Sequence, residues 1–234
     1  MPARLLPLLI LAVLTLLLRL STIDLVICRS FYEPTLPFPW KWGWCMPCEI
    51  LYHYGLIPAW ILFGAGCLLL AVRAGRKRLD TTLRCGLFLM LVFAIGPGLL
   101  VNLILKPGYG RPRPRDLVEF GGQHEFVPVL TPTPSLRCTS FPSGHAAMGF
   151  YLMAPAFLLW RRSRGWAALF AGTGLLMGSA IGVVRVVQGG HFPSDVVWSA
   201  GIVYVTALGM SRLLRLPESE QRATPSPPSE PAAA

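Results

Sequence analysis

Long, nearly uninterrupted apolar runs constrain this chain more than any other feature. The first run starts at Leu5 and contains fourteen almost purely apolar residues, and a bilayer core about 30 Å thick needs roughly 20 apolar residues in a helix. Only helices and closed barrels satisfy their backbone groups within lipid, and these runs lack the period of two of barrel strands. The sequence therefore predicts an all-α, polytopic membrane protein, a six-transmembrane-helix bundle with spans at Leu5–Cys28, Ile50–Val72, Gly86–Leu105, His145–Trp160, Trp166–Val184 and Ser194–Leu214.

The composition excludes several classes of protein. Of the 234 residues, 53% are apolar and 14% are charged, whereas soluble globular chains carry roughly a quarter charged residues. This balance argues against a soluble domain, a disordered protein, a coiled coil and, despite the net charge of +10, a nucleic-acid-binding protein. We expect one membrane domain over residues 1–216 and a disordered cytoplasmic tail over 217–234, which is dominated by Pro, Ser, Glu and Ala.

The basic residues predict an orientation, because short cytoplasmic loops carry an excess of Lys and Arg. We expect both termini in the cytoplasm and the longer connections on the external side, where eight basic residues are widely spread. The first run could instead be a cleaved signal peptide, although no A-x-A-like cleavage site follows Leu18. The twelve basic residues expected on the cytoplasmic side are Arg4, Arg73, Arg76, Lys77, Arg78, Arg84, Arg161, Arg162, Arg164, Arg212, Arg215 and Arg222.

Four of the six cysteines, Cys28, Cys45, Cys48 and Cys138, lie on or near the predicted external side. An even number there permits disulfides if that compartment is oxidising. Cys45 and Cys48 have the spacing of a redox or metal-binding pair, but the sequence has no second such pair and no nearby pair of histidines to complete a zinc site. Structural disulfides and free thiols both remain open.

The third connection is long for so short a chain and contains unusual polar residues. Lys106 and Arg113 lie at its start, Ser143 and Gly144 lie at its end, and the next external turn begins with Arg185. A lysine and two arginines supply a point charge and two planar forks of donors, which suit the oxygens of a phosphate ester. Basic residues alone could also contact lipid headgroups, but Ser143 and Gly144 open a helix whose free N–H groups favour an anion. These residues predict a phosphate site.

Two histidines, His145 and His191, accompany these phosphate-binding residues. One imidazole can attack phosphorus in line while the other protonates the departing oxygen. Asp195 follows His191 by four residues at a predicted helix start, close enough to hold the ring in the tautomer that leaves one nitrogen free for attack. The three segments together predict an enzyme that transfers a phosphoryl group.

Three segments resemble the signature motifs of the type 2 phosphatidic acid phosphatase (PAP2) superfamily: Lys106-x6-Arg113-Pro114, Pro142-Ser143-Gly144-His145 and Arg185-x5-His191-x3-Asp195. The resemblance implies that His191 is the nucleophile that forms a phosphohistidine, Asp195 its orienting partner and His145 the general acid. It also implies a six-helix membrane fold and no metal ion or other cofactor. The phosphate-binding residues that it implies are Lys106, Arg113, Ser143, Gly144 and Arg185.

Some residues depart from the motifs or fall outside them. Family members often have serine where Val184 stands, which removes one hydrogen bond. Arg111 and Arg115 are not motif positions, and we interpret them as surface basicity rather than as a site for a second phosphate or for sugar hydroxyls. His53 and His124 also lie outside the motifs, and we expect His53 to be interfacial.

A site at the mouth of a helical bundle can receive a lipid laterally, with the tails in the bilayer and the phosphate at the surface. Two segments, at 96–102 and 188–195, look similar to bacterial envelope members of the superfamily, including the lipid A phosphatases. We therefore expect an enzyme of the bacterial inner membrane that hydrolyses the 1- or 4′-phosphate of lipid A at the periplasmic face. Its partners would be the lipid substrate and the bilayer, and not nucleic acid, whereas its oligomeric state stays open.

Other substrates and another reaction remain open. Undecaprenyl diphosphate and phosphatidylglycerol phosphate are alternative substrates for the same pocket. A lipid phosphotransferase, which passes the phosphoryl group from His191 to a second lipid instead of water, could use the same residues.

Overall fold

The computed structural model describes residues 5–73 and 80–216, which form helices joined by loops. Neither strands nor a sheet occur in these ranges, which confirms the predicted all-α class, and the only strand-like pairs are two isolated bridges. The tail at 217–234 and the basic residues Arg4, Arg76, Lys77, Arg78 and Arg222 lie outside the described residues. The main helices are α1 (Leu6–Leu20), α2 (Ile23–Arg29), α3 (Met46–Tyr54), α4 (Ile57–Ala71), α5 (Thr81–Phe93), α6 (Lys106–Tyr109), α7 (Gly144–Tyr151), α8 (Ala154–Leu159), α9 (Arg164–Val187) and α10 (Pro193–Leu213).

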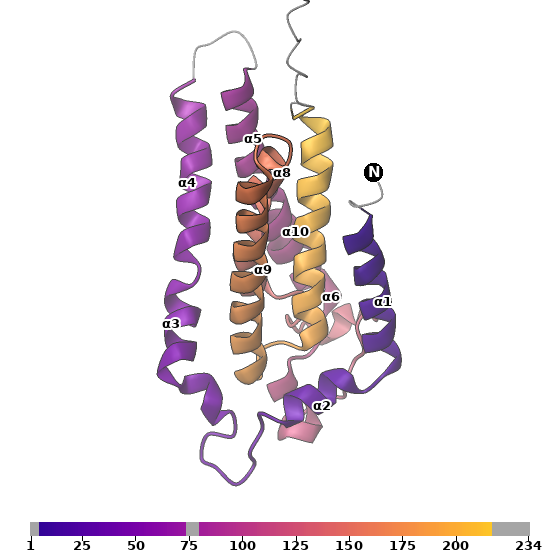
Figure 1. Ribbon diagram of the computed structural model, residues 1–234. Coiled ribbons are helices and arrows are strands. Elements are labelled where there is room, and N and C mark those ends of the chain that lie inside the picture. The colour runs from indigo at the N-terminus through magenta and orange to yellow at the C-terminus, as the bar shows by residue number, and fades with distance from the viewer. Residues whose placement is uncertain (1–4, 74–79, 217–234) are drawn as a thin grey trace, which may run out of the picture.

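The long helices run roughly parallel to one another in a bundle (Figure 1). Helices α9 and α10 lie near its middle, α4 pairs with α5 on one side, and α1 packs against α10 on the other. The start of α1 and the end of α10 lie at one end of the bundle, whereas α2 and the start of α10 lie at the opposite end. The long loop after α6, with its short 3-10 turns at Pro114–Asp116, Val118–Phe120 and Pro134–Leu136, also belongs to the α2 end.

The predicted count of six membrane spans is not confirmed. Four helical stretches in the described residues are long and apolar enough to cross a membrane, and they cover Met46–Ala71, Thr81–Tyr109, Arg164–Val187 and Pro193–Leu213. Helices α1 and α2 would count as a fifth span only as a bent pair, and Gly144–Leu159 is shorter than a span. The structure therefore supports four spans, or up to five.

The predicted span over Leu5–Cys28 is not a single straight helix, because the chain turns by 75° between α1 and α2. Asp24 explains the turn physically. Its carboxylate is completely buried and accepts hydrogen bonds from Arg111 and from the backbone of Ser194, and a carboxylate facing lipid would have no such partners. Helix α2 therefore runs across the end of the bundle (Figure 1).

The third helical stretch contains a π-helical segment, Ala94–Leu105, between α5 and α6. Pro97 lies inside this segment and has no N–H to donate, and the side chain of Asn102 donates a hydrogen bond to the Pro97 carbonyl at 2.7 Å. Irregular helical turns of this kind often occur at functional sites. Here the segment ends directly before Lys106, so its irregular turns set the direction in which the Lys106 side chain points.

Glycines let α9 approach α7 and α8 closely. A Cβ atom on Gly149 would lie 2.7 Å from the Gly178 Cα atom, and one on Gly174 would lie 2.8 Å from the Met153 Cα atom. Small residues at helix contacts are a common way to pack helices in membranes. This contact holds α7, which carries His145, against α9, which carries Arg185.

We expect Gly174→Ala to destabilise the protein by about 1–3 kcal/mol, because the added methyl group would press on the backbone of Met153. The measurement is thermal unfolding of the purified protein in detergent. Gly172→Ala is the matched control, since it lies on the same helix and its new Cβ would meet no atom within 4 Å. Equal midpoints for the two variants would contradict the proposed close contact.

Candidate active site

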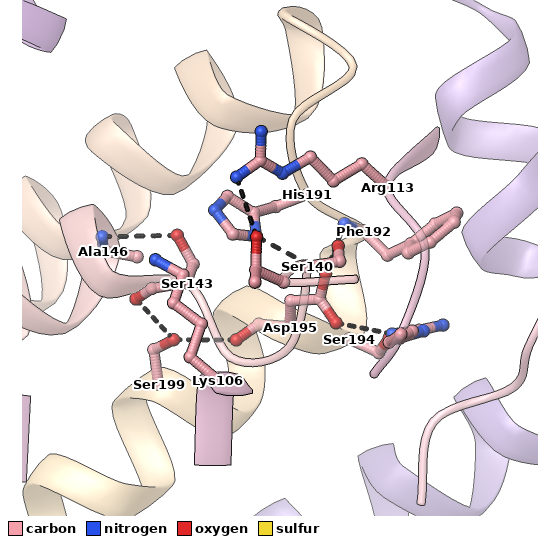
Figure 2. Close-up of polar contacts among 12 residues, drawn as sticks. Lys106, Arg113, Ser140, Ser143, Ala146, His191, Phe192, Ser194, Asp195 and Ser199 are labelled. Atoms are coloured by element: carbon pink, nitrogen blue, oxygen red, sulfur yellow. Dashed lines mark hydrogen bonds and ion pairs between the residues drawn. The ribbon is translucent and has the colours of Figure 1, made fainter. Parts of the chain in front are cut away.

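The sequence-predicted site residues lie at the end of the bundle that α2 crosses. Lys106 begins α6, Arg113 follows in the long loop, and Ser143 precedes α7. Figure 2 shows Lys106, Arg113 and Ser143 around His191, with Asp195 beside them. The remaining residues belong to the same neighbourhood: Gly144 and His145 form the first turn of α7, and Arg185 lies in the last turn of α9.

The start of α7 can receive an anion. Ser143 caps the helix by accepting a hydrogen bond from the Ala146 N–H, and Ser199 of α10 donates to the Ser143 carbonyl at 2.9 Å. A Cβ atom on Gly144 would lie 2.7 Å from the Asn102 side-chain oxygen and 3.3 Å from Lys106 Nζ. Only glycine therefore leaves room for the Lys106 ammonium group beside the first turn, where unpaired N–H groups and the helix dipole favour negative charge.

The cations of the site lack carboxylate partners. Within residues 5–73 and 80–216, neither Lys106 nor Arg113 nor Arg185 forms an ion pair with Asp or Glu. Arg113 donates instead to the Thr139 hydroxyl at 3.1 Å, and Arg185 donates to the side-chain oxygen of Gln188. Three half-buried positive charges gathered without counterions repel one another, and a bound anion would relieve that repulsion.

His191 lies in the loop between α9 and α10 and is almost completely buried, with 2% of its surface exposed. Its Nδ1 atom lies 3.6 Å from Asp195 Oδ2, which is ion-pair distance but longer than a hydrogen bond, and Nδ1 has no other partner. Burial lowers the pKa of His191, while the Asp195 carboxylate opposes that shift. Burial thus favours the neutral form of the ring, and with Nδ1 toward Asp195 the second nitrogen, Nε2, faces away from that carboxylate.

Asp195 is held by several donors. Its Oδ2 atom accepts from the Ser140 hydroxyl at 2.6 Å and from the Phe192 N–H at 2.9 Å, and its Oδ1 atom accepts from Arg111 at 2.5 Å (Figure 2 shows the Ser140 and Phe192 contacts). The bond to the Phe192 N–H fixes the start of α10 relative to the loop that carries His191. These bonds hold the Asp195 carboxylate, the expected partner of His191, in place.

The interpretation of Arg111 as surface basicity is wrong. Its side chain is completely buried and forms ion pairs with Asp24 at 2.9 Å and with Asp195. Sequence patterns show that a charge lies in a loop but not which distant carboxylates meet it, so the burial could not be foreseen. Arg115 is exposed at 45% of its side chain and pairs weakly with Asp116 at 3.9 Å, in agreement with surface basicity.

Tyr52 of α3 is a site residue that the sequence did not reveal. Its ring stacks on His145, with centroids 4.9 Å apart and planes 9° from parallel, and the Arg185 guanidinium carbon lies 4.8 Å from the same ring. The neighbouring His53 is exposed and 3.9 Å from Glu49, as expected of an interfacial residue. The only signal for Tyr52 is an aromatic pair around His53, which by itself is typical of any membrane interface.

All six cysteines are free thiols, and among the described residues no group of three or more His, Cys, Asp or Glu side chains could hold a metal ion. Cys138 Sγ lies 3.8 Å from His124 Nε2 in the long loop. His124 does not belong to any of the three motifs. Apart from Asp195 and His145, the polar groups around His191 are cations, hydroxyls and backbone N–H groups, which can bind the oxygens of a phosphate.

Known proteins with similar sequences include phosphatases, in agreement with a phosphate-binding site. The chain is similar to a lipid A 4′-phosphatase of Francisella tularensis subsp. novicida, with 40% identity over 121 residues, which is 51% of this chain and 53% of that protein. It is also similar to a lipid A 1-phosphatase of Rhizobium johnstonii, with 32% identity over 167 residues, 67% of this chain and 61% of that protein. The chain spans about half the length of the first curated relatives it matches. No solved structure matches significantly.

A family model described as the PAP2 superfamily matches residues 86–216, which include every predicted site residue. The matched segment starts inside α5 and ends after α10, so it contains the irregular helix before Lys106, the long loop, the start of α7 and the His191 loop. This match covers more than half of the chain, and with the apolar helices it shows that this multi-pass membrane protein belongs to the PAP2 superfamily.

Proposed function

We propose that the protein is a metal-independent phosphatase that hydrolyses the 1- or 4′-phosphate of lipid A through a phosphohistidine. The observation that carries this proposal is the buried His191, whose Nδ1 faces Asp195 beside the cations Lys106, Arg113 and Arg185. The lipid A phosphatase names of the relatives support the substrate. The family and the donor set support the reaction.

The phosphate group would bind before the chemistry starts. Lys106, Arg113 and Arg185 would contact its non-bridging oxygens, and the Ser143 hydroxyl and the free N–H of Gly144 would add hydrogen bonds. These groups are already in place, so they need little rearrangement as charge develops in the transition state, and such preorganised donors are usually the largest contribution to catalysis.

In the first step, His191 Nε2 attacks phosphorus and the bond from phosphorus to the lipid oxygen breaks. Burial and the nearby Arg185 lower the pKa of His145 to about 4 in the free protein, so its ring takes up a proton as the phosphate anion binds. His145 then donates this proton to the departing oxygen, which leaves as the lipid hydroxyl. His191 then carries the phosphoryl group on Nε2 and its proton on Nδ1, and the Asp195 carboxylate stabilises the resulting positive ring. The stacked Tyr52 ring restricts the orientation of His145.

In the second step, water attacks the phosphohistidine and the bond from phosphorus to Nε2 breaks. His145, now neutral, accepts a proton from the attacking water, and inorganic phosphate leaves. Both histidines return to their starting protonation states, so the cycle balances in atoms and protons. A lipid hydroxyl in place of water would make the same site a phosphotransferase.

We further propose that residues 1–216 act as one domain in the inner membrane, with both termini cytoplasmic and the site at the periplasmic face. The start of α1 and the end of α10 lie at the end of the bundle opposite α2, which supports this orientation (Figure 1). Helix ends between α4 and α9 carry Arg84, Arg161 and Arg164. Cytoplasmic ends of membrane helices are enriched in basic residues, so these arginines also support the orientation. In this orientation a lipid phosphate at the outer leaflet would be level with His191.

We expect the purified protein to release phosphate from lipid A in detergent that contains EDTA, and His191→Ala to lose at least about a thousandfold in kcat, because the nucleophile is absent. The assay should include undecaprenyl diphosphate, phosphatidylglycerol phosphate and phosphatidic acid. His124→Ala is the matched control, since that histidine lies outside the motifs and its ring contacts Cys138 in the long loop. Activity that EDTA removes and a divalent ion restores would contradict the mechanism.

Cells that contain the protein should yield lipid A with one phosphate fewer than cells that lack it, a loss of about 80 Da in the mass spectrum. Fragmentation would assign the loss to the 1- or the 4′-position. Cells with the His191→Ala variant should match the cells that lack the protein. Unchanged lipid A from cells with the active protein would remove lipid A as the substrate, and a phosphorylated acceptor lipid would identify a phosphotransferase.

A further inference from the structure

Arg111 is the largest completely buried side chain of the described residues, and its guanidinium group binds four partners. Its Nε atom donates to the Val127 carbonyl at 2.9 Å. One terminal nitrogen donates to the Ser194 hydroxyl at 2.7 Å and to Asp195 at 2.5 Å, and the other donates to Asp24 at 2.9 Å. A planar fork of donors can make all these contacts at once, whereas the single ammonium group of lysine cannot.

Asp24 binds the other side of the same network. Its Oδ1 atom accepts from the Ser194 N–H at 3.0 Å, and its Oδ2 atom accepts from Arg111 and from the Ser194 hydroxyl. Asp24 lies in α2, far outside the segment that the family model matches. The start of α10 is therefore held by a carboxylate from the N-terminal part of the chain.

The contacts of Asp195 account for most of what its carboxylate can accept. An ionised carboxylate has about four acceptor sites. Arg111 takes one on Oδ1, and the Ser140 hydroxyl and the Phe192 N–H take two on Oδ2, the oxygen 3.6 Å from His191 Nδ1. The Arg111 guanidinium carbon also lies 4.2 Å from the centre of the Phe192 ring. Arg111 thus contacts both the Asp195 carboxylate, which faces His191, and Phe192, which follows His191 in the chain.

We infer that Asp24 and Arg111 are positioning residues of the active site, which hold the Asp195 carboxylate against His191. The inference rests on the proposed function, because it concerns the same nucleophile. Asp24 shares the charge of Arg111, so that Arg111 anchors Asp195 Oδ1 without drawing the whole carboxylate away from the imidazole. Loss of Asp24 would leave Arg111 paired with Asp195 alone, which weakens the hold of Oδ2 on the His191 ring.

The alternative is that the network only anchors α2 to the bundle. In that case removal of a partner would lower stability, as loss of one member of a buried pair does, but each folded molecule would keep its full turnover. The two roles therefore differ in kcat per folded molecule, which must be measured well below each variant's own melting temperature.

The test compares wild type with Asp24→Asn, which keeps the shape but not the charge, and with Arg111→Lys, which keeps the charge but not the fork. We expect kcat for lipid A to fall at least about tenfold in both, the scale seen when the partners that orient ligands are removed at metal sites, with KM within about threefold. A second readout is the rise in melting temperature that orthovanadate causes, because vanadate bonded to His191 resembles the transition state. We expect this rise to shrink in both variants.

Arg73→Met is the matched control, because it removes an arginine from another ion pair, Arg73–Asp80 at 3.2 Å, outside the site. It should keep both the wild-type kcat and the vanadate effect. Wild-type kcat in folded Asp24→Asn and Arg111→Lys, or a rise in KM alone, would overturn the inference while the proposed function stands. A wild-type protein that neither releases phosphate nor responds to vanadate would overturn the proposed function, and the inference with it.

Discussion

Arg111 carries a positive charge in a region from which solvent is excluded, and its two carboxylate partners come from opposite ends of the sequence. Removal of an ion from water costs several kcal/mol, which only close partners with good geometry offset. Asp24, Arg111 and Asp195 must therefore stay together wherever the chain is folded. Because Asp24 lies in α2 and Asp195 in α10, this requirement draws the N-terminal segment across the end of the bundle.

The cations of the site show the opposite arrangement. Lys106, Arg113 and Arg185 are half buried, and no carboxylate of the described residues pairs with them. Carboxylates of the protein thus pair with Arg111, whereas the other three basic side chains have no such partner among the described residues. The guanidinium nitrogens of Arg111 bind protein groups, so Arg111 is not available to a phosphate although it lies only two residues from Arg113.

Several features could be predicted from the sequence because they depend on local patterns. Apolar runs of about 20 residues identify helices in lipid, and fixed spacings such as His191 to Asp195 place side chains within reach across a helix start. The helix count was less predictable. The first run reads as one span, but Asp24 finds its partners only when the chain bends after Leu20, and Gly144–Leu159 is too short to cross a membrane on its own.

Aromatic and glycine contacts were beyond the reach of the sequence for a related reason. Tyr52 stacks on His145, more than ninety positions later, and Gly174 lies close to Met153, which joins α7 to α8. Neither residue belongs to a recognisable pattern at its own position. Contacts of this kind depend on how two helices are rotated about their axes, which follows from the packing of the whole bundle.

The sequence by itself determined the helical class, the membrane environment, the family motifs and the set of residues able to bind a phosphate, because each follows from composition or from short spacings. Only the tertiary structure decided which arginine is buried between carboxylates and which have no carboxylate partner among the described residues, and that α2 supplies Asp24 to the network. The physical reason is that burial and pairing of a charge depend on neighbours in space, and those neighbours come from segments that the sequence separates by 84 to 170 positions.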